Sequence, residues 1–414
     1  MKNHLSRLLF INLMLIGSAF GAEVLGSKAL ATDFWLAKTT EEKQLTGNRL
    51  LAEARDLAQL HQWLKSGPQY AADVPRGYQE EVRLAEDGTR FPYVVLVPES
   101  YDPERSYAVE FMLHGGVDRP EWESGGKWWR RGYDSLEDPD RITVVPASWD
   151  EAFWWHSNQA ENIPAILKRI KQTYNVNDNR VYLTGMSDGG TGIFFFAFKQ
   201  STEWAAFLPF ISHPGVLQNP ASGGYKLYFE NLKSKPLYIV NGENDPLYPA
   251  ASLKAYIEGF QQVGVNYIFK VIAGGGHNTQ WMPQEAAMIA QFKQEHIRDP
   301  LPEVVEWITD DTSHYNRNHW LVIEELLNED SPGGMQAQRD GNSFNVFSTN
   351  LSAFTLLLSP DEIDFNQPVE VVVNGNTLFK DKVNEDAGTL LKWAGRDLDK
   401  TMLFTAELTV KIPE

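Results

Sequence analysis

Apolar and polar residues follow two different periods along this chain, and the changes of period divide it into segments. The first periodic segment, within residues 23–76, repeats its apolar residues every three or four positions, which is typical of one face of a helix. These residues are Leu50, Ala54, Leu57, Leu60 and Leu64, and Gly67-Pro68 ends the pattern. A helix with one apolar face must bury it. We therefore expect this helical segment to pack against the body of the protein, with coverage of a binding cleft as the alternative.

Residues 77–299 alternate short apolar runs, typical of strands, with helical patterns. Strands are expected at 78–84, 91–97, 108–113, 142–145, 181–183, 206–211, 237–240 and 267–271, and helices at 163–174, 191–199, 251–263 and 284–294. Apolar strands separated by helices predict an α/β fold, with a mostly parallel sheet covered by helices on both faces and antiparallel strands at its start. Functional residues of such sheets lie at the carboxyl ends of the strands.

Residues 300–414 lose this alternation after the stretch Asp299-Pro300-Leu301-Pro302. Short β-like runs follow at 304–308, 319–323, 343–347, 353–358, 369–373 and 403–410, separated in part by the turn signals Pro332-Gly333-Gly334 and Asn374-Gly375. The pattern predicts a small β-rich C-terminal domain.

Composition and charge limit the partners of the chain. With 414 residues, of which 43% are hydrophobic, the chain is long enough to bury a large core. Its formal net charge of -18 and the lack of a long basic run disfavour nucleic acids and anionic membrane surfaces as partners. A neutral or cationic substrate fits this charge better. The sequence pattern does not indicate the oligomeric state.

The first 22 residues have the pattern of a secretory signal peptide. Lys2 and Arg7 precede an apolar run from Leu8 to Ile16, and small residues up to Ala22 offer a cleavage site. The apolar run is too short to span a bilayer, and the chain has no cysteine for disulfides or an acylated anchor. We expect a secreted or periplasmic protein without a stable membrane anchor.

The chemistry is indicated most strongly by Gly185-Met186-Ser187-Asp188-Gly189-Gly190, which follows an apolar strand and precedes an apolar helix. Small residues around a serine permit a sharp strand-to-helix turn that exposes its hydroxyl above the sheet, the arrangement called a nucleophile elbow. Ser187 is therefore the expected nucleophile.

A serine hydroxyl needs a base to take its proton and an acid to orient that base. Both follow in chain order, each on a loop after a strand: Asp245 as the orienting acid, with Glu243 as a rival, and His277 on the loop Gly274-Gly275-Gly276-His277 as the base. The expected catalytic residues are Ser187, Asp245 and His277.

The negative charge that develops on the attacked carbonyl oxygen requires preformed N–H donors. The sequence His114-Gly115-Gly116 follows the strand at 108–113, so Gly115 or Gly116 is expected to supply one donor and Asp188 the other. The expected substrate-binding residues lie on nearby loops and are Trp154, Trp155, His156 and Trp281. Packing in the core is an equally good interpretation for the tryptophans.

Together, His114-Gly115-Gly116, the sequence around Ser187, Asn244-Asp245 and Gly276-His277 resemble the α/β-hydrolase superfamily. Within it, the chain is similar to secreted esterases related to polyhydroxybutyrate depolymerases and to feruloyl or acetylxylan esterases, across about residues 78–298. The resemblance implies a serine esterase that acts on a small or polymer-linked carboxylic ester through an acyl-enzyme, without a metal or organic cofactor. Many of those relatives carry cysteines near the active site, and this chain has none.

Two other functions fit parts of the sequence. A serine peptidase of the prolyl oligopeptidase type shares the chemistry and chain order, but the short N-terminal segment leaves no room for the large propeller of those enzymes. A noncatalytic protein that binds a polymer through its β-rich tail is the second alternative, and the presence of a full set of catalytic residues argues against it.

Overall fold

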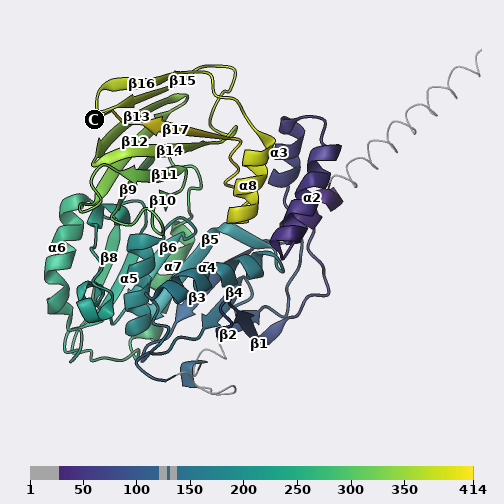
Figure 1. The fold of residues 1–414 in the computed structure, drawn as a ribbon. Coiled ribbons are helices and arrows are strands. Elements are labelled where there is room, and N and C mark those ends of the chain that lie inside the picture. Colours follow the sequence, from purple (N-terminus) through teal and green to yellow (C-terminus); the bar gives the residue numbers. More distant parts are fainter. Residues whose placement is uncertain (1–27, 121–127, 131–137, 414) are drawn as a thin grey trace, which may run out of the picture.

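The computed structural model describes residues 28–120, 128–130 and 138–413. The predicted signal peptide lies outside these residues and remains a prediction. The described chain forms a large sheet with flanking helices, a pair of smaller sheets above it and a group of N-terminal helices beside both (Figure 1). No helix among the described residues is long and apolar enough to cross a membrane.

The large sheet has eight strands in the order β1-β2-β4-β3-β5-β6-β7-β8. The strands are β1 (Gly77–Leu84), β2 (Arg90–Val97), β3 (Tyr107–Leu113), β4 (Arg141–Pro146), β5 (Val176–Met186), β6 (Ala206–Phe210), β7 (Leu237–Gly242) and β8 (Tyr267–Ile272). β2 pairs antiparallel with β1 and β4, and all other neighbours are parallel. The predicted α/β fold class is thus confirmed, including the antiparallel start.

Helices cover both faces of this sheet because its strands are apolar on both sides. Along β5, Val181 and Leu183 pack in the core with helices α4 (Ser157–Lys171), α5 (Asp188–Lys199) and α6 (Lys254–Val263). Tyr182, between them, belongs to the opposite face, which α7 (Met282–Glu295) covers. This alternation is the two-residue period of an extended strand buried on both sides.

The C-terminal segment is β-rich, as predicted, and its strands form two sheets around a separate apolar core. One sheet contains β10 (Arg317–Asn318), β11 (Leu321–Leu326), β14 (Leu351–Leu358) and β17 (Ala406–Lys411); the other contains β9 (Val304–Thr309), β12 (Gly333–Asp340), β13 (Ser343–Thr349), β15 (Val369–Val373) and β16 (Asn376–Asp381). The sequence pattern missed the two-residue strand β10, the strands β12 and β16, and the helix α8 (Ala387–Asp397). β12 was missed because its glycines, Gly333 and Gly334, suggested a turn, whereas they begin the strand and pair with β9.

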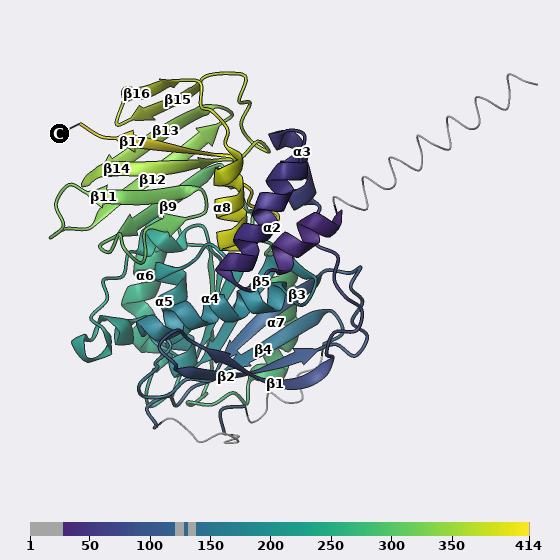
Figure 2. The same cartoon turned by 45° about the vertical axis from the view of Figure 1, so that its right-hand side comes forward.

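The N-terminal segment packs as expected, but its main partner is α8 of the C-terminal segment. It comprises a helix over residues 28–36, α2 (Thr40–Glu53) and α3 (Leu57–Lys65). Figure 2 shows α2 and α3 beside α8. Leu50 and Leu64 share an apolar cluster with Leu390 of α8. The periodic stretch is two helices rather than one, because Ala54 is extended and Asp56 caps the second helix through the N–H of Gln59.

The C-terminal segment docks on the end of the large sheet that lies away from Ser187. Arg298, which is fully buried, bonds to Asp399 and, over 2.7 Å, to Asn179 near the start of β5. Ser187 follows the other end of β5, so eight residue-to-residue steps along an extended strand, about 26 Å, separate it from Asn179. The two C-terminal sheets therefore do not line the surroundings of Ser187.

Candidate active site

Ser187 lies between β5 and α5 in a backbone conformation that side chains rarely adopt, with φ 54° and ψ -121°. Glycines permit this turn. A Cβ atom on Gly185 would lie 2.4 Å from the backbone of Gly189, and one on Gly189 would lie 2.0 Å from the carbonyl oxygen of Leu113. Only glycine fits at both positions, so the structure has the strained strand-to-helix turn that the sequence predicted.

His277 lies on the loop between β8 and α7, and the end of that loop is fixed in the core. The indole of Trp281 is buried, packs edge-on against Phe210 and donates to the carbonyl oxygen of Asn278 over 2.9 Å. The glycines that precede His277 let the chain turn back over the sheet edge, as expected for a loop that carries an imidazole toward Ser187.

Asp245 follows β7 and is buried, with 1% of its surface exposed. Its Oδ1 accepts hydrogen bonds from the backbone N–H groups of Leu247 and Tyr248 over 2.8 and 2.9 Å. Burial pushes the pKa of Asp245 upward, but the N–H of Tyr248, the ring of His277 and the N–H of Leu247 together hold this pKa below its ordinary value. The carboxylate is therefore ionised at neutral pH and accepts hydrogen bonds on both oxygens.

The three side chains predicted for catalysis form one hydrogen-bonded chain. His277 Nδ1 lies 2.8 Å from Asp245 Oδ2, and His277 Nε2 lies 2.9 Å from Ser187 Oγ. Because an ionised carboxylate only accepts, Nδ1 carries the proton and Nε2 is left to accept from the serine hydroxyl. The rival acid, Glu243, bonds instead to the N–H of Gly274 over 2.8 Å. The imidazole is thus oriented as a base toward Ser187.

The backbone that carries the predicted oxyanion donors lies beside Ser187. A Cβ atom on Gly115 would lie 2.7 Å from Cβ of Ser187, so this backbone passes directly beside the nucleophile. Gly116 has a φ of 66°, and Asp188, the first residue of α5, accepts from the N–H of Val117 through Oδ2 over 3.0 Å. The contact between Asp188 and Val117 ties the Gly115-Gly116 loop to the start of α5, where backbone N–H groups point outward.

His114 holds this loop in place, which is a structural rather than a catalytic role. Its Nδ1 donates to the carbonyl oxygen of Gly115 over 2.9 Å, and its Nε2 accepts from the N–H of Ser148 over 3.0 Å. In a trans peptide, the N–H of Gly116 points opposite to the carbonyl of Gly115, so His114 fixes the direction of that donor. Burial lowers the pKa of His114 to about 4, which keeps the ring neutral and able to donate and accept at once.

The residues predicted to bind substrate lie around this site, but mostly in the core. Trp154 is fully buried and donates to the carbonyl oxygen of His114 over 2.9 Å, and Trp155 is 3% exposed. Together with the buried Trp281, these side chains support the site loops, which favours the packing interpretation over direct contact with a substrate. His156 is partly exposed at the start of α4 and packs against Phe153.

Tyr248 is a further neighbour that the sequence analysis did not mention. Its ring lies edge-on to His277, with 5.8 Å between the ring centres, and stacks on His213 at 6.2 Å. Its backbone N–H also bonds to Asp245. In the sequence, the only signal of these contacts was that Tyr248 lies three residues after Asp245.

Residues 76–297 match the family model described as the dienelactone hydrolase family, and this match covers more than half of the chain. The chain belongs to the dienelactone hydrolase family. The matched residues contain all eight strands of the large sheet together with Ser187, Asp245 and His277. The predicted resemblance to α/β-hydrolases is therefore confirmed, and the residues after 297 lie outside the match.

This dienelactone hydrolase family member is also similar to several known proteins. The bifunctional acetylxylan esterase/xylanase XynS20E of Neocallimastix patriciarum is 23% identical over 171 residues, which are 40% of this chain and 23% of that protein. The chain thus spans less than a quarter of that relative. Two solved structures are each similar to 53% of this chain. One is a thermostable esterase, with 19% identity, a TM-score of 0.43 and 63% of its own chain covered. The other is the S-formylglutathione hydrolase FrmB of Staphylococcus aureus, with 16% identity, a TM-score of 0.42 and 98% of its own chain covered.

Proposed function

We propose that this protein is a serine esterase that cleaves carboxylic esters through an acyl-enzyme on Ser187. The observation that carries the proposal is the hydrogen-bonded chain from Ser187 Oγ through His277 to Asp245, with distances of 2.9 and 2.8 Å. Such a chain gives a serine hydroxyl the general base that it needs to attack a carbonyl carbon.

In the first half of the reaction, Ser187 Oγ attacks the ester carbonyl while its proton moves to Nε2 of His277. Asp245 stabilises the imidazolium that forms, without taking the proton itself. The N–H groups of Asp188 and of Gly116 or Gly115 receive the oxyanion. The tetrahedral intermediate then expels the alcohol, which leaves with the proton from His277, and the acyl group remains on Ser187.

In the second half, a water molecule replaces the alcohol. His277 takes a proton from the water as the water attacks the acyl-enzyme, and the intermediate collapses to release the carboxylic acid. The proton on His277 returns to Ser187 Oγ, which restores the starting state. No step of this reaction requires a metal.

The substrate class in this proposal is a neutral or cationic ester, free or attached to a polymer. The net charge of -18 disfavours strongly anionic substrates. Similarity to a protein named as an acetylxylan esterase supports ester rather than amide hydrolysis. The N-terminal pattern of charge and apolar residues supports action outside the cytoplasm.

The proposal is tested with an activated aryl ester of a short acid. The wild-type protein should hydrolyse it with a burst of aryl alcohol, and Ser187→Ala should remove turnover while circular dichroism and thermal unfolding stay unchanged. A phosphonate ester should add covalently to Ser187 in the wild type alone, as measured by peptide mass spectrometry. Equal turnover by Ser187→Ala would refute the proposal.

Matched ester and amide substrates with the same acyl group separate the esterase from the peptidase alternative. An amide must have its poor amine leaving group protonated, so an esterase should prefer the ester by a wide margin. A higher kcat/KM for the amide would favour a peptidase of the prolyl oligopeptidase type. The absence of both activities and of phosphonate addition would favour a noncatalytic binding protein.

A further inference from the structure

A cavity lies where the N-terminal helices, α4 and α8 meet. Its volume is about 730 Å³, within the range of small-molecule sites. The walls come from three segments that are distant in sequence: α2 with the residues before it, the second half of α4, and α8. Figures 1 and 2 both show these helices side by side.

The lining of this cavity is cationic, although the chain as a whole is strongly acidic. Five lining residues are basic: Lys38, Lys43, Lys168, Lys392 and Arg396. None of its described lining residues is acidic, whereas the chain has 55 Asp and Glu against 37 Lys and Arg. A local excess of one sign, opposite to that of the whole molecule, concentrates counter-ions at this place.

Four of these cations form no salt bridge with any described carboxylate: Lys38, Lys43, Lys168 and Arg396. The fifth, Lys392, pairs with Glu407 over 2.6 Å. Lys43 donates only to backbone carbonyl oxygens, the nearer being that of Phe34 at 2.9 Å. Arg396 lies over the ring of Trp393 at 4.7 Å. The nearest acid on α8, Asp397, is already bound to Arg317 through both oxygens. The charges of Lys43, Lys168 and Arg396 are therefore not neutralised by a salt bridge within the described protein.

The pKa values are consistent with cations crowded together and partly removed from water. Burial, followed by repulsion from Lys168, lowers the pKa of Lys43 to about 8. Burial lowers the pKa of Lys168 as well, although Glu203 and Asp397 act in the opposite direction. The pKa of Arg396 is lowered by burial and then by Arg317. A bound anion would offset these costs.

The remaining walls combine apolar and small residues with uncharged polar ones, which are Thr39, Thr40, Gln44, Asn48 and Gln172. Phe34, Leu51, Leu391 and Leu398 supply apolar surface, and the small residues of the lining, such as Ala165, leave open space between the helices. A lining that combines cations with apolar side chains suits a ligand with a charged head and an apolar body.

From this geometry we propose that the cationic cavity binds a small amphipathic organic anion, with a carboxylate or phosphate head held by Lys43, Lys168 and Arg396 and an apolar body against Phe34 and Leu391. Such a ligand would join all three segments of the chain at one site. The proposal does not depend on the esterase activity, because the cavity shares none of its lining residues with the Ser187 site.

The test is calorimetric titration of the whole protein with hexanoate, hexyl phosphate and the neutral hexanamide. At least one anion should bind with one-to-one stoichiometry and raise the thermal unfolding midpoint, and the tighter of the two identifies the head group. Hexanamide should bind at least about tenfold more weakly, because it lacks the charge. Added salt should weaken the binding of the anion.

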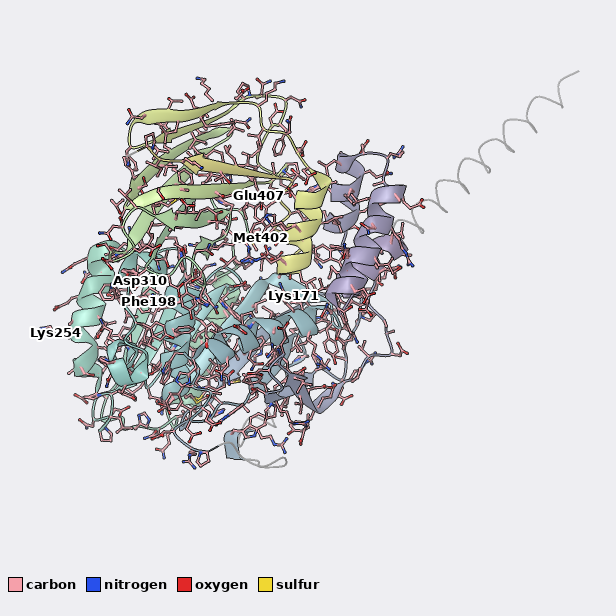
Figure 3. The ribbon with its side chains drawn as sticks, in the orientation of Figure 1. Lys171, Phe198, Lys254, Asp310, Met402 and Glu407 are labelled. Atoms are coloured by element: carbon pink, nitrogen blue, oxygen red, sulfur yellow. The ribbon has the colours of Figure 1, made fainter. Side chains whose placement is uncertain are left out.

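The variant Lys168→Gln/Arg396→Gln should weaken this binding at least about tenfold, whereas Lys226→Gln/Lys254→Gln, with the same loss of charge, should not. Lys254 lies on α6, on the far side of the molecule from Lys171, which is on α4 close to Lys168 (Figure 3). If the double variant does not fold, the single variants Lys168→Met and Arg396→Met are titrated in its place. Unchanged affinity in folded variants, equal binding of hexanamide, or no anion binding at about 1 mM would overturn the proposal.

Discussion

His277 Nε2 lies 2.9 Å from Ser187 Oγ, although 90 residues separate the two in the chain. One side chain comes from the turn after β5 and the other from the loop after β8, and the parallel sheet brings both to the same edge. This hydrogen bond implies that His277 and Ser187 depend on each other in the proposed reaction.

The first prediction is that the losses caused by Ser187→Ala and His277→Ala do not add. Each variant alone should lower kcat for an aryl ester by at least about 10³-fold, and the double variant should be no worse than the poorer single variant. The measurement is a double-mutant cycle on kcat with thermal unfolding as the control for folding. Additive losses would show that the two side chains act independently.

The second prediction separates Asp245 from its neighbour Glu243. Asp245→Asn should lower kcat by about 10³ to 10⁴-fold, because an amide no longer selects the tautomer with the proton on Nδ1 of His277. Glu243→Gln should change kcat by less than about fivefold, since it alters only an exposed hydrogen bond to Gly274. Equal effects of the two variants would contradict the assignment of Asp245.

The third prediction concerns His114 as a positioning residue. His114→Ala frees the carbonyl of Gly115, so the neighbouring N–H of Gly116 should lose its fixed direction. The expected result is a fall in kcat of about 10 to 100-fold with little change in KM, since the donor acts mainly on the oxyanion. Partial rescue by His114→Asn, whose amide can donate to the same carbonyl, would support positioning. A change in KM alone would contradict it.

The fourth prediction is an acid-dependent loss of stability linked to His114. In the unfolded chain its pKa returns to about 6.5, whereas burial holds it at about 4 in the folded protein. Between these values the unfolded state binds more protons, so stability falls as the pH drops from about 6.5 to about 4, by about 3 kcal/mol from this residue.

The measurement is urea unfolding between pH 7 and 4 for the wild type and His114→Asn. The variant lacks this titration, so the difference in unfolding free energy between the two proteins should shrink as the pH falls. A constant difference across this range would contradict the buried, neutral state of His114.

The fifth prediction tests how the C-terminal segment is held. Arg298→Met would leave Asp399 buried without its cation, which should lower the unfolding free energy by about 3 to 5 kcal/mol. Lys380→Met breaks an exposed pair with Glu370 and should cost less than about 1 kcal/mol. Activity per folded molecule should stay unchanged in both, since this contact lies at the other end of β5 from Ser187. A selective loss of kcat in folded Arg298→Met would indicate coupling between the two ends.

Local patterns were enough to predict most of the large sheet and the residues that meet at its edge. The runs around Val181 and Leu237 are apolar on both faces, which only a covered sheet accommodates. Ser187, Asp245 and His277 each follow such a run, so their order along the chain already implied a common edge. The choice between Asp245 and Glu243 rested on sequence placement until the hydrogen bonds were known.

Other features depend on contacts between distant segments and could not be read from short windows. The strand β12 has polar residues and glycines, and it is a strand because β9 and β13 supply its hydrogen bonds. The helix α8 buries Leu390 against the N-terminal helices, which lie about 330 residues earlier in the chain. Nothing near Trp154 in the sequence indicated that its indole would support His114 from the core.

The sequence by itself determined the fold class of the large sheet, the serine, acid and histidine placed after its strands, and the β-rich nature of the C-terminal segment. These properties depend on periodicity and on residue types within short stretches, where each residue's neighbours in sequence are also its neighbours in space. Only the tertiary structure decided which acid meets His277, which tryptophans are buried, and where the N-terminal helices and the cationic cavity lie. Those outcomes depend on packing between segments far apart in the chain, where the burial of apolar surface and the pairing of buried charges select one arrangement.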